Sequence, residues 1–169
     1  MNKAFVAILM GSDSDLPMVE AAFPIFDKFA IPFEVKVTSA HRTPKATADY
    51  VIDADARGCA VFICAAGMAA HLAGAVAAMT LKPVVGVPIN ASLNGLDSLL
   101  STVQMPAGIP VATVAIGKAG AKNAAYLAAQ IIAVGNDELR AILIEERAAN
   151  AQAVIEKDQA LQQKLGVQR

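Results

Sequence analysis

The chain has 169 residues, of which 56% are hydrophobic and only 17% are charged. This length corresponds to about one domain, and the hydrophobic content rules out general disorder. The net charge of −1 argues against a protein that coats nucleic acid, because such a protein needs a basic surface. We therefore expect a compact domain whose excess apolar surface is covered by self-association.

One stretch, Cys59–Leu81, carries no charged residue and is long enough to span a bilayer. It contains glycines and His71, however, and its pattern is that of a strand, a loop and an Ala-rich helix, so we expect no membrane span. The N-terminus enters a strand-like run without a separate apolar signal region, which predicts a cytoplasmic location. The two cysteines, Cys59 and Cys64, are too few for a disulfide framework or a zinc site, and we expect buried thiols.

The first part of the chain alternates solid apolar runs with helical patterns. Ala4–Met10 is predicted to be a buried strand, and a helix capped by Ser14 or Asp15 follows it. The next elements are a strand at Phe33–Val37, a loop at Thr38–Pro44, a helix capped by Thr43 that runs to about Arg57, and a strand at Ala60–Ala65.

The same alternation continues to the end of the chain. A loop from Gly67 to Gly74 leads into an Ala-rich helix, and Val84–Val87 is predicted to be the fourth strand. The stretch from Pro88 to Gly108 is irregular, with a helical piece near Leu96–Val103. The remaining elements are a fifth strand at Val111–Ile116, a helix at Lys118–Val134 and a long helix, capped by Asp137, that reaches about Lys164.

Solid apolar strands that alternate with helices indicate a parallel sheet covered on both faces. Right-handed crossovers then produce a three-layer α/β/α sandwich, and five strands favour the flavodoxin-like order 2-1-3-4-5. We expect a single domain over residues 1–169, with its core at residues 1–135. The final helix, residues 137–164, is longer than the sheet needs, and it either packs as an ordinary helix or reaches a neighbouring subunit.

Candidate functional residues follow the first three strands. In an open parallel sheet, ligands bind at the carboxyl ends of the strands, where the strand order switches, and these three loops should converge there. Both histidines of the chain, His41 and His71, fall in these loops. A single loop histidine is more often a solvated or capping residue, but two histidines in converging loops indicate proton transfer near neutral pH.

The loop after the first strand has features that suit a phosphorylated sugar. Gly11 allows close backbone approach, and Ser12 and Ser14 offer hydroxyl and N–H groups at a helix N-terminus, where anions are stabilised. Asp15 could instead accept hydrogen bonds from sugar hydroxyls, and Arg42 supplies a positive fork for a phosphate. The alternatives are an ordinary helix cap in this loop and a surface salt bridge at Arg42.

Other classes lack their signatures here. There is no Gly-x-Ser-x-Gly elbow for an esterase-like triad, and no Cys/His cluster that suggests a metal. A phosphorelay receiver also uses this fold and acidic loops, and Lys118 near the fifth strand is similar to its lysine. The third strand ends in Ala65-Ala66-Gly67, however, with no aspartate to phosphorylate.

Several longer phrases resemble one family in the same order and spacing over about the first 135 residues. They are Met10–Asp15, Ser39–Pro44, Ala69–Leu72, Gly86–Pro88, Val103–Pro106, Gly108–Val111, Ala115–Gly120 and Asn123–Ala125. In these phrases the chain is similar to the 5-(carboxyamino)imidazole ribonucleotide mutases of bacterial purine synthesis. The resemblance implies an isomerase that moves a carboxylate from the exocyclic nitrogen of an aminoimidazole ribonucleotide to ring carbon four.

The resemblance also implies a small-molecule substrate, a phosphorylated aminoimidazole riboside, with no cofactor and no metal. The roles it implies are a proton shuttle at His41, ribose-phosphate binding by Ser12, Asp15 and Arg42 with Ser39 nearby, and a lining around the base and the travelling carbon dioxide made by Gly67 and His71. It further implies a homo-octamer in the cytoplasm.

The third loop departs from the commoner bacterial pattern, Gly-Ala-Gly-Gly-Ala-Ala-His-Leu-Pro-Gly, at Ala65, Met68 and Ala73. These departures concern the mobility of the loop and its backbone contacts with the base, not His71. A second class of the superfamily carboxylates aminoimidazole ribonucleotide directly with carbon dioxide, but it lacks the Ala-Ala-His-Leu run. A flavodoxin-like module that only binds a phosphorylated nucleotide is the remaining alternative, and it would have no need of a proton shuttle at His41.

Overall fold

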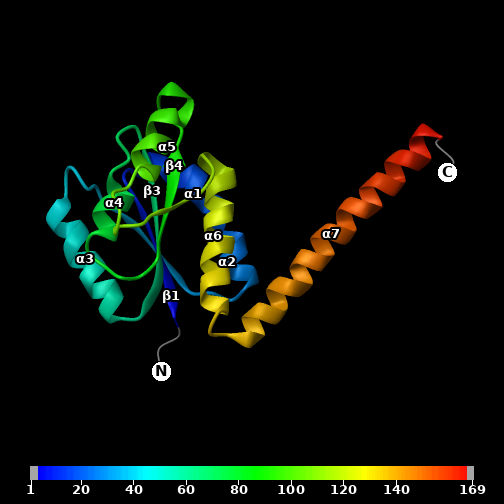
Figure 1. Ribbon diagram of the computed structural model, residues 1–169, viewed down its shortest axis with the longest axis horizontal. Helices are drawn as coiled ribbons and strands as arrows, with labels where there is room; N and C mark the ends of the chain where they lie inside the picture. The colour runs from blue at the N-terminus through cyan, green and yellow to red at the C-terminus, as the bar shows by residue number, and fades with distance from the viewer. Residues whose placement is uncertain (1–3, 167–169) are drawn as a thin grey trace. The chain divides into compact units, whose positions relative to one another are not determined.

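The computed structural model describes residues 4–166, which contain a five-stranded sheet (Figure 1). The strands are β1 (Phe5–Met10), β2 (Phe33–Val37), β3 (Cys59–Gly67), β4 (Val84–Ile89) and β5 (Ala112–Thr113). All neighbouring strands run parallel, in the order β2-β1-β3-β4-β5. The predicted flavodoxin-like α/β/α architecture and its strand order are confirmed.

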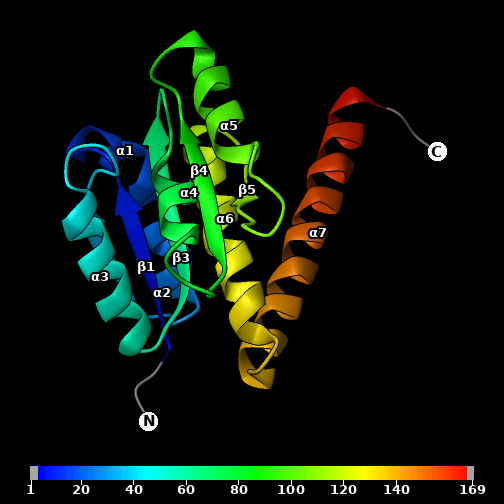
Figure 2. The same ribbon diagram turned by 60° about the vertical axis from the view of Figure 1, so that its left-hand side comes forward.

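Helices connect and extend these strands. They are α1 (Leu16–Val19), α2 (Phe23–Lys28), α3 (Pro44–Ala56), α4 (Leu72–Ala77), α5 (Leu96–Val103), α6 (Gly117–Ala133) and α7 (Asp137–Leu165), with 3-10 turns η1 (Asp13–Asp15), η2 (Glu20–Ala22) and η3 (Leu93–Gly95). Helices α2 and α6 cover one face of the sheet, and α3, α4 and α5 cover the other (Figures 1 and 2). Because both faces are covered, β1 and β4 are buried at every position.

Strand β1 supplies apolar side chains to both layers of the core. Ala7 and Leu9 belong to a buried cluster that also contains Val51 of α3. Val6 and Ile8 point to the opposite face, because successive side chains of a strand alternate, and both are fully buried. Apolar burial on two faces therefore anchors the middle of the sheet.

Helix α6 approaches the sheet closely because its inner face is made of small residues. Ala121, Ala124 and Ala125 are buried along it. At Gly120, an added Cβ would lie only 1.6 Å from the carbonyl oxygen of Ala115. Since that oxygen belongs to the backbone, a side chain at this position requires the helix or the strand end to move.

Substituting Gly120→Ala is therefore expected to lower the free energy of unfolding by about 2 kcal/mol or more. Gly135→Ala is the matched control, because nothing lies within 4 Å of the Cβ that it would add. Chemical denaturation of both variants measures the difference. Equal stability of the two variants would contradict the close packing described for α6.

Strand β2 forms one edge of the sheet, where Val35 and Val37 are exposed. The Arg57 guanidinium donates to both carboxylate oxygens of Glu34, at 2.5 and 2.8 Å, and the Tyr50 hydroxyl donates to the same carboxylate at 3.0 Å. These hydrogen bonds, led by those from Arg57, hold the pKa of Glu34 below its ordinary value. The edge strand is thereby tied to α3.

The fifth strand is shorter than predicted, at Ala112–Thr113 instead of Val111–Ile116. It pairs only with Val85 and Gly86 of β4, and beyond this pair the Val114 N–H makes one more bond to the Gly86 carbonyl. The chain then has to turn into α6. By contrast, β3 and β4 pair through to Gly67 and Ile89, so both extend further than their apolar runs indicated.

The predicted long final helix is present as α7, but its cap differs from the prediction. The Asn136 side chain, not that of Asp137, accepts the Leu139 N–H at 3.0 Å. The chain divides into two compact units, the first ending at Ile132 and the second beginning at Ala133. That residues 1–169 act as a single domain stays a prediction. Within residues 4–166, no helix combines the length and the apolar character needed to cross a membrane.

Candidate active site

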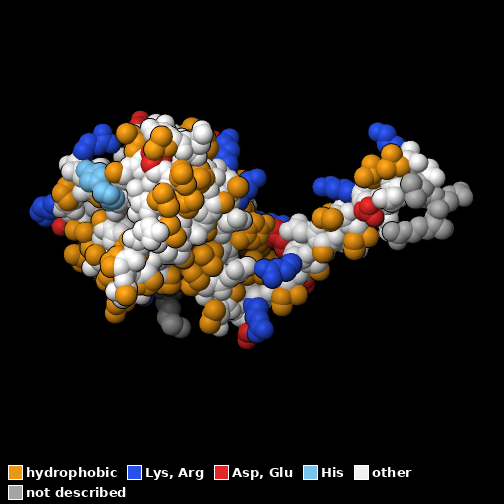
Figure 3. Space-filling view, turned by 45° about the horizontal axis from the view of Figure 1, so that its top comes forward, with side chains coloured by type: hydrophobic (Ala, Val, Ile, Leu, Met, Phe, Trp, Pro, Cys, Tyr) orange, Lys and Arg blue, Asp and Glu red, His pale blue; other side chains and the backbone are white. Residues whose placement is uncertain are grey.

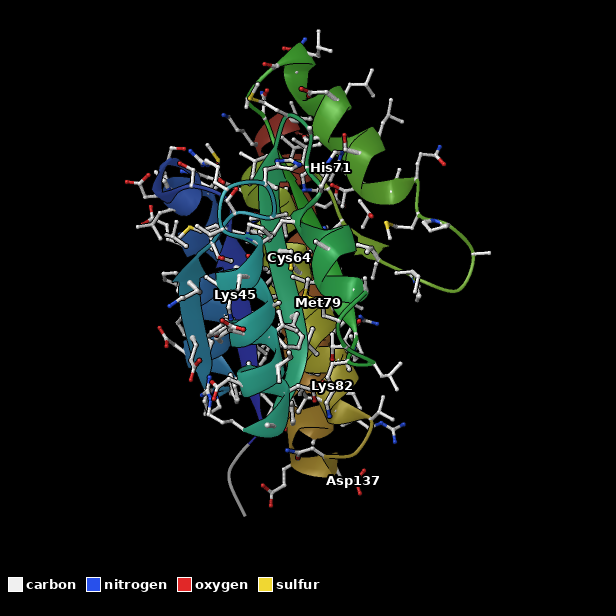
Figure 4. The ribbon with its side chains drawn as sticks, turned by 90° about the vertical axis from the view of Figure 1, so that its left-hand side faces the viewer. Lys45, Cys64, His71, Met79, Lys82 and Asp137 are labelled. Carbon is white, nitrogen blue, oxygen red and sulfur yellow. The ribbon has the colours of Figure 1, made fainter. Side chains whose placement is uncertain are left out.

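The loops after β1, β2 and β3 meet at the carboxyl edge of the sheet, around a cavity of about 560 Å³. All the residues predicted for the site line this cavity: Ser12, Asp15, Ser39, His41, Arg42, Gly67 and His71. In Figure 4, His71 lies near this end of the sheet and Lys82 lies near the other. The topology thus brings together every predicted site residue, although their roles stay predictions.

The cavity also has lining residues that the sequence did not single out. Ala91, which comes from the loop after β4, is one of them. It carries no polar group and sits in a stretch with no clear pattern, so no sequence signal could have identified it. Met68 and Ala69, from the loop after β3, also line the cavity. The sequence noted Met68 as a departure from the family pattern and Ala69 as part of the Ala69–Leu72 phrase, but it assigned neither of them to the site.

The two histidines contact each other directly. His41 Nε2 and His71 Nδ1 lie 2.8 Å apart, and the rings meet edge to face, at 78°. Figure 3 shows the two imidazoles as one patch on the surface of the molecule. One of the two nitrogens must carry a proton and the other a lone pair, so the pair shares a single N–H in this bond. Such an arrangement can accept a proton at one ring and release one at the other.

Hydrogen-bonded hydroxyls fasten the loop that carries His41. Thr38 and Thr47 are buried and joined by a 2.7 Å hydrogen bond between their hydroxyl oxygens. Thr43 stands at the predicted cap position of α3, but its hydroxyl oxygen accepts the Ser39 N–H at 2.9 Å instead of capping the helix. The loop that carries His41 is therefore fastened to the first turns of α3.

The loop after β1 gathers hydroxyl groups at the cavity. Ser12 caps the 3-10 turn η1, and its Oγ accepts the Ser14 N–H at 3.3 Å. Asp15, one of the two predicted caps, stands at the cap position of α1, but its side chain makes no capping hydrogen bond there. The Ser14 hydroxyl donates to the same oxygen at 2.8 Å. Exposed hydroxyls of this kind can turn to donate to an anion.

Arg42 points its guanidinium across to the first loop. Its Nη2 donates to the Gly11 carbonyl oxygen at 3.1 Å, and its backbone N–H donates to Ser39 Oγ at 3.1 Å. Among residues 4–166, no carboxylate forms an ion pair with Arg42. The surface salt bridge considered as an alternative is therefore not formed within that range, and further guanidinium N–H groups remain available to a phosphate.

Asp15 is the acidic residue of the cavity, and only 9% of it is exposed. Burial raises the pKa of its carboxyl, and the nearby negative charge of Asp13 raises it further. In its neutral form the carboxyl can donate a hydrogen bond to a phosphate oxygen, whereas in its ionised form it can accept one from a sugar hydroxyl.

Neither cysteine takes part in this site. Cys59 and Cys64 are free and buried, as predicted. Burial raises the pKa of Cys59 to about 11 and also raises that of Cys64, so both remain thiols at neutral pH. Within the described part of the chain, no three His, Cys, Asp or Glu side chains gather as a metal site would require.

Comparison with known proteins identifies the family of the chain. The family model described as AIR carboxylase matches residues 5–153. The chain belongs to the AIR carboxylase family. Two members called N5-carboxyaminoimidazole ribonucleotide mutase, from Aliivibrio fischeri and Escherichia coli, are each 52% identical to it. The alignments cover 89% of this chain and 94% of the first relative, and 92% of both chains for the second.

A solved structure has the same fold as this chain. The crystal structure of Treponema denticola PurE superposes with a TM-score of 0.86 at 30% identity, over 94% of this chain and 99% of that one. The matched region includes all the strands and the three loops that line the cavity. The cavity therefore lies wholly within the part of the chain that the family model matches.

Removing the Arg42 guanidinium is expected to weaken binding of a phosphorylated aminoimidazole riboside by about 10- to 100-fold, because one charge-assisted hydrogen bond is lost. Lys45→Ala is the matched control: it also removes one positive charge, but its ammonium pairs with Asp49 outside the cavity. Titration calorimetry of Arg42→Ala and the control gives the two affinities. If both variants bound as tightly as the wild type, Arg42 would not be a phosphate ligand.

Proposed function

We propose that the protein converts N5-carboxyaminoimidazole ribonucleotide into 5-amino-1-(5-phospho-D-ribosyl)imidazole-4-carboxylate, an isomerisation in purine biosynthesis. Curated relatives with this mutase name match about nine-tenths of the chain at about half identity. The observation in the structure that carries the proposal is the His41–His71 hydrogen bond, at 2.8 Å, in the same cavity as Ser12 and Arg42. Proton transfer and phosphate binding are thus available to one ligand.

The histidine pair suits both halves of the reaction. In the first half, His41 donates a proton to the exocyclic nitrogen, the nitrogen–carboxylate bond breaks, and its electron pair stays on that nitrogen as carbon dioxide departs. In the second half, the electron pair of ring carbon four forms a bond to carbon dioxide. His41 then takes the proton from that carbon, so no proton is gained or lost overall. His71 is placed to hold the His41 ring and to share its N–H.

The ribose phosphate would bind across the first two loops. Ser12 and Ser14 offer hydroxyls, and Arg42 offers a guanidinium that already reaches the first loop. A neutral Asp15 would add a hydrogen-bond donor where an ionised carboxylate would repel the phosphate, and burial moves its pKa in that direction. Ser39 stays near this group through its bond from the Arg42 N–H. Gly67 and Ala91 close in beside the base.

Two alternatives make different use of the same cavity. A direct carboxylase would take carbon dioxide and aminoimidazole ribonucleotide. Its reaction requires only the second proton transfer, the removal of the proton from ring carbon four. A nucleotide-binding module would use the phosphate side alone, and the direct contact between His41 and His71 would then have no purpose. The mutase uses both sides of the cavity and both directions of proton transfer.

The decisive assay supplies the carbamate ribonucleotide to the purified protein without ATP and follows the 4-carboxylate. We expect conversion by the wild type and a loss of about 100- to 10,000-fold in kcat for His41→Asn, with the fold and ligand binding retained. A His41→Asn variant that keeps a tenth of wild-type activity would remove His41 from the mechanism. Product from aminoimidazole ribonucleotide and bicarbonate, with none from the carbamate, would instead favour the direct carboxylase.

A homo-octamer in the cytoplasm is part of the proposal. Free cysteines are typical of a reducing compartment, which supports the location. Large apolar side chains are exposed on both compact units. In the unit that ends at Ile132, Leu81 is fully exposed and Leu93 is 76% exposed, and in the unit that begins at Ala133, Val154 is 65% exposed. Surface of this kind favours a closed assembly that covers it.

Light scattering at micromolar concentration is expected to give a mass about eight times that of the 17.4 kDa chain. The exposed leucines and valines provide the physical reason, since association removes them from water. A mass near that of one chain would refute both the octamer and this explanation of the apolar surface.

A further inference from the structure

Met68 has a backbone conformation that residues with a side chain rarely adopt. Its φ is 54°, in the left-handed region, where a Cβ crowds the backbone and glycine is favoured. It directly follows Gly67, the last residue of β3, and it is 59% exposed where it lines the cavity. A strained backbone conformation persists only where the surrounding structure holds it in place. Residues in such conformations cluster at functional sites.

The left-handed turn itself serves to place His71. The Met68 carbonyl accepts the Ala70 N–H at 2.9 Å and lies 3.5 Å from Ser101 Oγ of α5, which donates to it. In the next step of the chain, the Ala69 carbonyl accepts the His71 N–H at 2.8 Å. These two tight turns lead the chain from β3 into α4. A glycine would make the same turn without strain, so the turn alone does not account for the methionine side chain.

We propose that the Met68 side chain closes over the bound aminoimidazole ring and retains carbon dioxide in the cavity between the two halves of the reaction. This inference rests on the proposed mutase function. A methionine has three rotatable side-chain bonds and an apolar, polarizable thioether, so it can fold down over a planar ring without a fixed partner. The neighbouring lining, Ala69, Leu72 and Ala91, is apolar as well and offers no side-chain hydrogen bond to water.

The chemistry makes such a cover useful at one step only. Once the nitrogen–carboxylate bond has broken, the cavity holds aminoimidazole ribonucleotide and an uncharged carbon dioxide molecule that nothing tethers. If carbon dioxide leaves, the amine is released as a side product and the carbon dioxide hydrates to bicarbonate in solution. A side chain that excludes water and blocks the exit therefore changes the partition between product and side product, not the rate of bond breaking.

The test compares the wild type, Met68→Gly and Met68→Leu with unlabelled carbamate ribonucleotide in buffer that contains ¹³C-bicarbonate and carbonic anhydrase. Mass spectrometry measures ¹³C in the 4-carboxylate and the amount of aminoimidazole ribonucleotide released per product, after subtraction of the enzyme-free decay of the carbamate. We expect Met68→Gly to raise the released amine per product by about tenfold, and to bring label into the product, because the exit is uncovered. Met68→Leu keeps the apolar bulk and should stay within about twofold of the wild type.

The fold of Met68→Gly is checked separately. Relief of the left-handed strain offsets the greater backbone freedom of glycine, so the melting temperature should stay within about 3 °C of the wild type. Ala30→Gly is the matched control, since Ala30 also has a positive φ, 49°, but lies outside the cavity. It should retain carbon dioxide as the wild type does.

The outcomes separate the two proposals. Suppose that the wild type forms the 4-carboxylate and that Met68→Gly shows unchanged amine release and no label uptake. That result overturns the role of Met68 and leaves the mutase function standing. A wild type that forms no 4-carboxylate from the carbamate overturns the function, and the role of Met68 falls with it. Leakage by Met68→Gly and Met68→Leu alike would also contradict a cover that depends on apolar bulk.

Discussion

Burial of the central strands is the constraint on which the site depends. Because β1 is covered on both faces, the chain can present polar side chains only where that strand ends. The sheet register then sets the spacing of the loops: the Gly11 N–H bonds the Ala65 carbonyl, and the Thr38 N–H bonds the Met10 carbonyl. The three loops therefore begin next to one another, because these hydrogen bonds join the ends of their strands. The cavity is a consequence of this register rather than of any single motif.

The hydrogen bond between His41 and His71 sets the two imidazole rings against each other inside the cavity. The two facing ring nitrogens share a single N–H in their hydrogen bond. In the proposed reaction one proton enters at nitrogen and one leaves carbon, and a single N–H of this kind is enough for both steps. The hydroxyls of Thr38 and Thr47 are buried and hydrogen-bonded to each other, which fastens the end of β2 to α3 at the base of the loop that carries His41.

Much of this arrangement could be predicted because it rests on local patterns. Apolar runs and their alternation with helices were enough for the strand order, and topology then brought the residues at the strand ends together. Side-chain contacts depend on tertiary detail, so the direct bond between His41 and His71 could not be foreseen. The end of β5 depends on the fit of Gly120 against Ala115, a close approach that leaves no local signal.

Other differences arise where two residues suit one task equally. Asn136 and Asp137 are both good caps, and a shift of one residue in the helix start decides between them. Ser12 caps a 3-10 turn, η1, that precedes α1 and that the sequence pattern did not indicate, while Asp15 keeps the predicted cap position of α1 without a capping hydrogen bond. Ala91 has no chemistry of its own, and only the length of β4 brings it to the cavity.

The hydrogen bonds from Arg57 and Tyr50 to Glu34 affect the edge of the sheet that β2 forms. An edge strand presents unpaired N–H and C=O groups that can recruit a strand from another molecule. In β2, charged Glu34 and Lys36 interrupt the apolar sequence, and Arg57 holds the Glu34 carboxylate in place as a fixed charge. Lys36 also lies over the ring of Tyr50, at 5.7 Å from its centre. Fixed charges at the β2 edge oppose the addition of a strand from another molecule there, so the proposed assembly would have to form through side-chain surfaces elsewhere.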